Sequence, residues 1–315
     1  MSALPTQACD GLAGTRETGF VLQMQSFSVN DGEGVRTVVF LPGCPLRCRW
    51  CSNPETWTPL PKLAVYHSKC VDCGACEQAC PQSLFPPKRE NPAAAGCKAC
   101  GICAGECPSG ALKILVQEMS VAEVVQKVER DAVFFRSSGG GVTFSGGEPT
   151  FQAEFLRTLV REFDRRGIDM CMETCGYFIW DAVSDILEKL GHVLFDLKHM
   201  DPAVHKELTG VSNERILENC GRIAALGKKL TVRMPVVRNV NGTWENFEAT
   251  ARFMKDRLPG ASIELLPYHD LGREKYRAIG QAARLHDEYE APDRRKMEEA
   301  EGFFRRQGIN VVRYR

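Results

Sequence analysis

Cysteines in three compact groups are the residues best able to do chemistry in this chain. The sequence holds 15 cysteines, and eleven of them fall between Cys44 and Cys107. The first group is a loop that reads Cys44-Pro-Leu-Arg-Cys48-Arg-Trp-Cys51. Its three thiolates can bind three irons of a cubane cluster and leave the fourth iron open, as catalytic metal sites do. The alternative is a zinc loop whose fourth ligand lies elsewhere in the chain.

The second and third groups repeat one spacing. Cys70-x₂-Cys73-x₂-Cys76-x₃-Cys80-Pro81 is followed by Cys97-x₂-Cys100-x₂-Cys103-x₃-Cys107-Pro108. In bacterial two-cluster ferredoxins of this pattern, the fourth cysteine of each run ligates the other cluster. The spacing therefore predicts one [4Fe–4S] cluster on Cys70, Cys73, Cys76 and Cys107. It predicts a second cluster on Cys97, Cys100, Cys103 and Cys80. A zinc ribbon uses four cysteines in two pairs and does not explain eight in this order.

The four remaining cysteines, Cys9, Cys171, Cys175 and Cys220, show no ligand spacing with one another. Cys171 and Cys175 adjoin a predicted strand. They are interpreted as small buried apolar side chains, a common role for free cysteine.

The elements that must position these residues change character along the chain. Two apolar segments, Phe20–Phe27 and Arg36–Pro42, flank a polar loop and predict strand, turn, strand. Ser120-Val-Ala-Glu123 is a capping box that opens a helix to about Phe135. Further strands are predicted at Val142–Ser145, Asp169–Glu173, His192–Leu197, Lys229–Val237 and Ser262–Tyr268, with helices at roughly 151–167, 178–190, 213–227 and 243–257. The tail predicts a helix from about Pro292 to Gln307 and an edge strand at Asn310–Tyr314.

This alternation predicts an α/β fold with a parallel sheet whose active residues gather at the carboxyl ends of the strands. The expected organisation is a flexible leader at 1–18 and a first part of the core at 19–60. A cysteine-rich insert follows at 61–115, and the remainder of the core with a C-terminal helix occupies 116–315. The insert has too few apolar residues for a core of its own, so crossed cluster ligation is expected to hold it together.

Composition excludes several classes of function. Of the 315 residues 43% are apolar and 25% charged, with 40 basic against 40 acidic side chains. Such a balance favours neither nucleic acid nor an anionic membrane as a partner. No apolar run approaches the roughly 18 residues of a membrane span. Residues 1–17 do not read as a signal peptide, so a cytoplasmic location with reduced thiols is expected.

Several short motifs together resemble those of a known family. They are Asp31-Gly-Glu33-Gly-Val-Arg36-Thr37, the cysteine loop with Asn53-Pro54, Ser145-Gly146-Gly147-Glu148-Pro149, Asp196-Leu-Lys198 and Pro267-Tyr-His269. From about Gly19 to Tyr276 the chain resembles the glycyl radical enzyme activating enzymes of the radical S-adenosylmethionine (SAM) superfamily. Pyruvate formate-lyase activating enzyme is the familiar relative, and the closest likeness is to the subgroup with a two-cluster ferredoxin insert. The resemblance implies a partial (β/α)₆ barrel in which SAM chelates the open iron of the first cluster.

The resemblance also implies roles for single residues. Gly146 and Gly147 would let the backbone approach SAM, and Glu148 would meet its ammonium group. Asp196 and Lys198 alternate, so they share a face. Lys198 would neutralise the SAM carboxylate, and Asp196 would contact SAM or a monovalent cation, although a structural ion pair is the alternative. His269 would contact the ribose of SAM, and Trp50 would lie near its adenine. Glu173-Thr174 stands where relatives have Asp-Thr at a cation. Asp31 would contact the partner protein. Here Glu33 replaces the proline of the relatives' Asp-Gly-Pro-Gly loop.

The activity implied is reductive cleavage of SAM to a 5′-deoxyadenosyl radical, which removes hydrogen from a glycine of a partner glycyl radical enzyme. The expected cofactors are three [4Fe–4S] clusters and SAM, with flavodoxin or ferredoxin as electron donor and the chain acting as a monomer. Overall likeness favours isethionate sulfite-lyase as the partner. Choline trimethylamine-lyase, glycerol dehydratase and arylacetate decarboxylases are alternatives. Two other hypotheses are a radical SAM enzyme for a small molecule or peptide and a non-catalytic iron–sulfur electron carrier.

Overall fold

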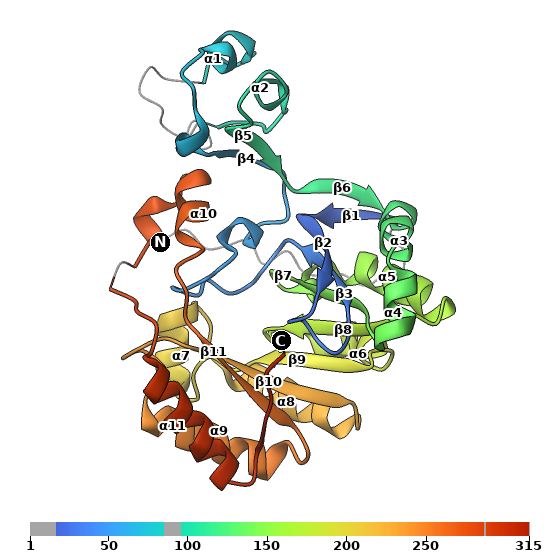
Figure 1. Cartoon of the computed structure of the whole chain (residues 1–315), viewed down its shortest axis with the longest axis vertical. Helices are drawn as coiled ribbons and strands as arrows, with labels where there is room; N and C mark the ends of the chain where they lie inside the picture. Colours follow the sequence, from blue (N-terminus) through green and yellow to red (C-terminus); the bar gives the residue numbers. More distant parts are fainter. Residues whose placement is uncertain (1–16, 85–95, 287, 315) are drawn as a thin grey trace.

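An eight-stranded, mostly parallel sheet forms the centre of the computed structural model, which describes residues 17–84, 96–286 and 288–314 (Figure 1). The strand order is β12-β11-β10-β9-β8-β7-β3-β2. All neighbours pair in parallel except β2 and β3, which are antiparallel. The strands are β2 (Gln23–Ser28), β3 (Arg36–Leu41), β7 (Gly141–Gly146), β8 (Asp169–Thr174), β9 (His192–Asp196), β10 (Lys229–Val236), β11 (Ser262–Pro267) and β12 (Asn310–Val311).

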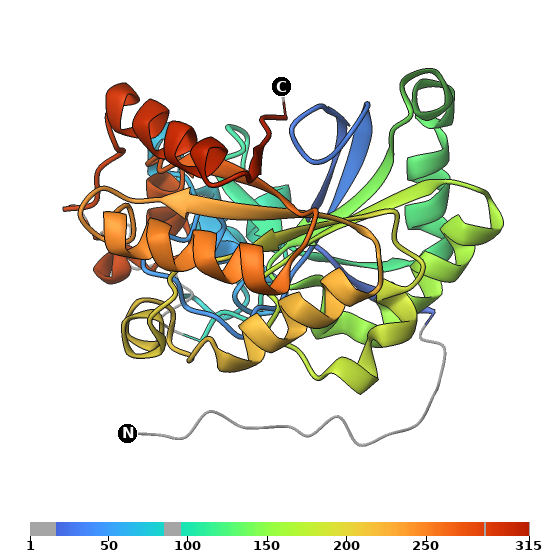
Figure 2. The same cartoon turned by 90° about the horizontal axis from the view of Figure 1, so that it is seen from below.

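Amphipathic helices cover the outer side of the curved sheet (Figure 2). In α5 (Ala153–Arg165) the buried residues recur at helical spacing: Phe155, Leu156, Leu159, Val160 and Phe163. The other helices of the core are α3 (Val121–Glu129), α4 (Ala132–Ser138), α6 (Ser184–Leu187), α7 (Pro202–Thr209), α8 (Glu214–Ala225), α9 (Trp244–Arg257), α10 (Arg273–Ala278) and α11 (Arg294–Arg306). Within the described ranges, no helix has both the length and the apolar character needed to cross a membrane.

A small cysteine-rich unit projects from one end of the molecule (Figure 1). Its two ends are joined by the antiparallel strands β4 (Lys62–Val65) and β5 (Leu112–Leu115). Between them lie α1 (Ala75–Ala79) and α2 (Ile102–Gly105), each preceded by a glycine of positive φ, Gly74 and Gly101. The repeated cysteine spacing therefore has repeated backbone geometry. These strands stand at the two ends of the segment predicted to be an insert.

Several predicted elements differ from the structure at one end of the sheet. The segment predicted as a single strand at Phe20–Phe27 is two strands, because the chain bends at Leu22. Its first part, β1 (Thr18–Val21), pairs with β6 (Gln117–Ser120), the strand that returns from the insert. The leader was predicted to span residues 1–18. Residues 1–16 lie outside the described residues, and Thr18 already belongs to β1. Cys9 likewise lies outside the described residues.

Two helix predictions were too long. The capping box of Ser120 and Glu123 is confirmed, but its helix ends at Glu129 and α4 begins after Asp131. The buried Asp131 carboxylate accepts a hydrogen bond from the Thr37 hydroxyl at 2.6 Å. The helix expected over 178–190 is a short 3₁₀ turn followed by α6. The short helices α7 and α10 were not predicted, since each shows little more than one or two turns of periodicity.

Candidate active site

A cavity of about 270 Å³ opens at the carboxyl ends of the parallel strands. Its walls combine the cysteine loop after β3, the glycine loop after β7, and the ends of β8, β9 and β11. The predicted site residues that line it are Cys44, Cys48, Trp50, Cys51, Gly146, Gly147, Glu173, Thr174, Asp196, Lys198 and His269. Residues from five separate stretches of sequence are thus gathered in one place, as parallel α/β folds allow.

Backbone hydrogen bonds hold the cysteine loop against neighbouring segments. The amide of Gly43 donates to Thr56 O at 2.7 Å, and the amide of Arg47 donates to Thr209 O at 2.7 Å. The Arg47 guanidinium also donates to Cys44 O at 2.6 Å. Cys48 is buried, and Cys44 and Cys51 are half-buried. The three thiols are therefore presented to the cavity by a loop anchored on both sides.

Gly146 and Gly147 border the cavity, but it is the packing of neighbouring protein backbone that leaves no room for a side chain at either position. A Cβ on Gly147 would lie 2.4 Å from Gly43 O, and one on Gly146 would lie 2.7 Å from the backbone of Leu41. Gly146 also has a φ of +112°, which favours glycine. The glycines let the loops after β3 and β7 pack together, and the backbone of the second loop becomes a wall of the cavity.

Glu148 was predicted to meet the ammonium group of SAM, but its carboxylate points away from the cavity. It is buried, and its Oε1 accepts hydrogen bonds from the amide and the hydroxyl of Thr150, at 3.2 and 2.7 Å. Its Oε2 accepts from the Thr174 hydroxyl at 2.7 Å and the Cys175 amide at 2.8 Å. Four protein donors therefore occupy this carboxylate, and the side chain ties the β7 loop to the end of β8.

Asp196 and Lys198 do share one face, as their alternation predicted. Lys198 Nζ lies 2.8 Å from Asp196 Oδ2, and both border the cavity. Burial favours a lower pKa for Lys198, but the Asp196 carboxylate outweighs burial and raises the pKa of Lys198 above its ordinary value. Lys198 therefore carries a positive charge beside the three cysteines. The amide of Asn241 donates to Lys198 O at 2.8 Å and fixes its backbone.

Glu173 lines the cavity and is held by an arginine that sequence reasoning missed. Arg233 on β10 is 4% exposed, and its guanidinium lies 2.8 Å from Glu173 Oε1 and 2.9 Å from Glu264 Oε2. The Ser145 hydroxyl donates to the other oxygen of Glu173 at 2.5 Å. Burial opposes ionisation of Glu173, but Arg233 outweighs it and lowers the pKa below its ordinary value. An arginine between the apolar residues Val232 and Met234 of a predicted strand was the available signal, because such a residue is seldom buried unpaired.

Asp31 does not border the cavity but joins the same network from the loop between β2 and β3. Its loop precedes β3, whereas the cysteine loop follows it. Asp31 Oδ1 lies 3.6 Å from Arg233 Nη1, and Ser28 donates a hydrogen bond to Oδ2. Burial, with the nearby Glu173 carboxylate, raises the pKa of Asp31. Glu33 in the same loop pairs with Lys229, and the C-terminal segment lies beside the loop in both views (Figures 1 and 2).

Three other predicted residues that line the cavity, His269, Trp50 and Thr174, differ in their exposure and contacts. His269 is exposed at the end of β11. Trp50 is 7% exposed and packs in a small core with Leu208, Val237 and Tyr289. It therefore belongs to this core and also forms part of the cavity wall. The Thr174 hydroxyl is directed to Glu148 and accepts the amide of Gly176 at 3.0 Å.

Cys175 is a further residue of the site that sequence reasoning assigned to the core. It is 5% exposed, lines the cavity and packs with Leu46, Cys44, Cys48 and Cys51. The neighbouring Cys175 side chain is the main cause that lowers the pKa of Cys44. Its position directly after Thr174, at a strand end, was the available signal. Cys171, by contrast, is fully buried in β8 and does not border the cavity.

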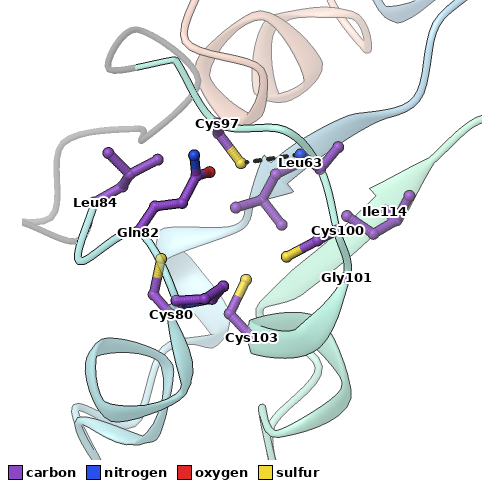
Figure 3. Close-up of a pocket in the computed structure, with 11 residues that line it drawn as sticks. Leu63, Cys80, Gln82, Leu84, Cys97, Cys100, Gly101, Cys103 and Ile114 are labelled. Carbon is purple, nitrogen blue, oxygen red and sulfur yellow. Dashed lines mark hydrogen bonds between the residues drawn. The ribbon is translucent and has the colours of Figure 1, made fainter.

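In the insert, four cysteines surround a small pocket that also includes Leu63 and Ile114 (Figure 3). They are Cys80, Cys97, Cys100 and Cys103. The amide of Ala99 donates to Cys97 Sγ at 3.3 Å. These are the four residues assigned from their spacing to one cluster, so the fourth cysteine of the first run lies with three of the second. In the other predicted set, Cys70 contributes to the raised pKa of Cys76, whose main cause is burial.

The class of protein follows from comparison with known families and structures. The radical SAM superfamily matches residues 38–254. A radical SAM methyltransferase from Sphaerobacter thermophilus superimposes with a TM-score of 0.52 at 14% identity, over 93% of this chain and 76% of that one. This likeness concerns the fold alone.

Relatives with higher sequence identity identify the family within this superfamily. The (2S)-3-sulfopropanediol dehydratase activating enzyme of Klebsiella oxytoca is 40% identical over 83% of this chain and 86% of its own length. The isethionate sulfite-lyase activating enzyme of Nitratidesulfovibrio vulgaris is 41% identical over 86% and 91%. The chain therefore belongs to the glycyl radical enzyme activating enzymes of the radical SAM superfamily.

This family implies a [4Fe–4S] cluster and SAM, and the residues present fit both groups. Cys44, Cys48 and Cys51 line one cavity, so their three thiolates can each bind one iron of a cubane and leave the fourth iron open. The buried cation Lys198 borders the same cavity and suits the carboxylate of SAM. Across residues 17–84, 96–286 and 288–314, no three Cys, His, Asp or Glu side chains surround a single ion position. A cubane does not require that arrangement, because each thiolate binds a different iron.

Proposed function

We propose that this chain activates a glycyl radical enzyme by reductive cleavage of SAM, with a [4Fe–4S] cluster on Cys44, Cys48 and Cys51. The observation that supports it is the set of three loop thiols in one cavity with the buried cation Lys198. When bound there, the cluster supplies the electron that cleaves the carbon–sulfur bond of SAM, and the resulting 5′-deoxyadenosyl radical takes a hydrogen atom from a glycine α-carbon of the partner.

The residues of the cavity bind and orient SAM in this proposal. Lys198 offers a buried positive charge to the SAM carboxylate, and Asp196 fixes the ammonium of Lys198. The backbone of Gly146 and Gly147 receives the ammonium end of SAM, in place of the Glu148 side chain, which protein donors already occupy. His269 and Trp50 bracket the nucleoside at the rim and wall. A cation role for Glu173 is not included, because Arg233 and Ser145 engage its two oxygens.

Asp31 is proposed to meet the glycine-bearing segment of the partner. Its loop lies on the inner side of the sheet and is linked through Arg233 to Glu173 in the cavity wall. Contact between the partner and Asp31 would therefore be transmitted through Arg233 to Glu173 in the SAM site. The ion pair of Glu33 and Lys229 holds this loop to the start of β10.

The insert is proposed to hold two further [4Fe–4S] clusters in crossed ligation. The grouping of Cys80 with Cys97, Cys100 and Cys103 supports this assignment for one of them. Their role would be to pass electrons from a flavodoxin or ferredoxin. The test is iron content after anaerobic reconstitution, in which Cys80→Ala and Cys107→Ala should each lose about four irons per chain. Cys220→Ala, in the core of α8, should lose none.

The partner is proposed to be a lyase that cleaves a small organosulfonate, with isethionate sulfite-lyase as the first candidate. Support comes from the relatives that act on isethionate sulfite-lyase and on sulfopropanediol dehydratase. Choline trimethylamine-lyase and 4-hydroxyphenylacetate decarboxylase activating enzymes are less similar, at 35% and 36% identity.

The decisive experiment is electron paramagnetic resonance (EPR) of the reduced chain mixed with SAM and each of these lyases. A glycine-centred doublet in an organosulfonate lyase supports the proposal. A doublet only in the choline or arylacetate enzymes overturns the partner assignment. Release of 5′-deoxyadenosine without any doublet favours a small-molecule or peptide substrate instead.

A further inference from the structure

The C-terminal segment leaves the edge of the sheet and turns toward its inner side. After β12 the amide of Val312 donates to Ile263 O at 2.9 Å. Arg313 Nη2 lies 2.6 Å from Glu301 Oε1 of α11. The next residue, Tyr314, is half-buried. The tail is therefore held to β11 and α11 before its tyrosine is reached.

Tyr314 contacts the starts of two central strands. Its hydroxyl lies 3.0 Å from Thr231 Oγ1 on β10 and 3.4 Å from His192 Nε2 on β9. The centroids of the Tyr314 and His192 rings lie 5.8 Å apart. The side chain is thus held by two strands that are remote from it in the sequence.

The tail also contacts the acid that pairs with Arg233. The amide of Tyr314 donates to Glu264 Oε1 at 3.0 Å, and Arg233 Nε lies 2.9 Å from Glu264 Oε2. The guanidinium carbon of Arg233 lies 5.9 Å from the centroid of the Tyr314 ring, within the range of a cation–π contact. Tyr314 therefore orients Arg233 in two ways, through the Glu264 carboxylate and through its own ring.

Arg233 in turn contacts the loop that is proposed to meet the partner. Its Nη1 lies 3.6 Å from Asp31 Oδ1, and its Nη2 donates to Asn30 O. The C-terminal segment lies beside this loop in both views (Figures 1 and 2). These contacts form one continuous chain from Tyr314 through Glu264 and Arg233 to Asp31.

The loop needs contacts of this kind to hold one conformation. It contains Gly32 and Gly34, which have φ values of +119° and +69°. Glycine has many backbone conformations available, so contacts from outside the loop have to select one of them. A loop that is fixed before binding loses less freedom on binding, and it therefore binds more tightly.

We propose that Tyr314 is a positioning residue that fixes the Asp31 loop through Glu264 and Arg233 and thereby strengthens binding of the partner's glycine-bearing segment. The inference rests on the proposed function, because it takes Asp31 as a contact of the partner. The position of the loop itself can be tested without any partner.

The first test is hydrogen–deuterium exchange of the full chain, reconstituted anaerobically and read by mass spectrometry. Tyr314→Ala should speed exchange in peptides that cover residues 29–35 by about tenfold. Tyr314→Phe should stay near the parent, because it keeps the ring and the backbone amide. Phe303→Ala is the matched control, since it removes a half-buried ring of α11 that packs against Trp244 of α9.

The second test is the rate of glycyl radical formation, followed by EPR at increasing concentrations of isethionate sulfite-lyase. Tyr314→Ala should raise the apparent KM for the lyase about tenfold. Release of 5′-deoxyadenosine without lyase should stay near the parent rate, because Tyr314 lies at the starts of β9 and β10 and the cavity opens at the strand ends. In an Asp31→Asn background the same substitution should add little, since residues of one network are not additive.

Three results overturn the inference. One is parent-like exchange of residues 29–35 in Tyr314→Ala. The second is an equal increase of exchange in Phe303→Ala, which would indicate general loosening of the C-terminal region. The third is an effect of Tyr314→Ala on the KM for the lyase that persists in the Asp31→Asn background. Failure of the proposed function would instead show as a parent protein that releases no 5′-deoxyadenosine or forms no glycyl radical, and exchange alone would then decide whether Tyr314 fixes the loop.

Discussion

Arg233 Nη1 lies 2.8 Å from Glu173 Oε1, and this ion pair of a buried arginine connects the wall of the cavity with the loop that carries Asp31. The same guanidinium also pairs with Glu264 and donates to Asn30 O. One side chain of β10 thus joins β8, β11 and the loop before β3. Because Arg233 and Glu264 are buried and Glu173 is half-buried, removing the guanidinium that they share should cost far more than losing a surface ion pair.

Arg233→Met should lower the free energy of unfolding by about 3–5 kcal/mol, because it leaves the buried Glu264 and the half-buried Glu173 without their cation. The measurement is urea unfolding of the anaerobically reconstituted protein. Arg166→Met is the control, since Arg166 pairs with Glu129 and Glu162 on the surface, where such pairs contribute at most about 1 kcal/mol. Similar losses in the two variants would contradict the central role of Arg233.

Gly147→Ala should disrupt the junction of the two loops and abolish SAM binding. The added Cβ would meet two backbone atoms, Gly43 O at 2.4 Å and Thr56 O at 3.0 Å, which cannot move without displacing the cysteine loop. Binding can be followed by the change of the EPR signal on addition of SAM. Gly105→Ala is the control, because nothing lies within 4 Å of its Cβ position. Parent-like SAM binding by Gly147→Ala would show that the loops adjust.

The fold was largely predictable because its strands carry strong local signals. The runs at Asp169–Glu173, Lys229–Val237 and Ser262–Tyr268 are apolar, short and regularly separated by helices, and each became a parallel strand within a residue or two of its predicted ends. The break after Leu22 was not predictable. It depends on β1 pairing with β6, almost a hundred residues away, and no local pattern reports that contact.

The candidate site also has one part that the local sequence could predict and one part that it could not. The spacing of Cys44, Cys48 and Cys51 and the Asp196–Lys198 alternation are local, and these residues line one cavity in the structure. The direction of the Glu148 side chain is not local. It depends on the amide of Cys175 and the hydroxyl of Thr174, which arrive from the next strand. A motif can thus predict where a residue stands without predicting which way its side chain points.

Glu148→Gln should destabilise the protein by about 1–3 kcal/mol and weaken SAM binding. A carboxylate accepts at both oxygens, whereas an amide would turn an NH₂ group toward one pair of donors, either those of Thr150 or those of Thr174 and Cys175. Urea unfolding and a SAM titration measure the two effects. Glu162→Gln, on the exposed side of α5, serves as the control. Lost SAM affinity at unchanged stability would instead indicate that the Glu148 carboxylate contacts SAM directly.

His192 should make stability depend on pH in a defined window. It is 5% exposed, its Nε2 lies 2.9 Å from Thr231 Oγ1, and burial, with the charge of Lys229, lowers its pKa to about 4. Between pH 6.5 and 4 the unfolded chain binds a proton that the folded chain does not, so stability falls as the pH falls through this range. From pH 7.5 to 5.0 the contribution is about 2 kcal/mol. In His192→Gln the loss of unfolding free energy between these pH values should be smaller by that amount. The exposed His67→Gln should keep the parent's dependence, and an unchanged slope in His192→Gln would show that His192 is not held neutral by the fold.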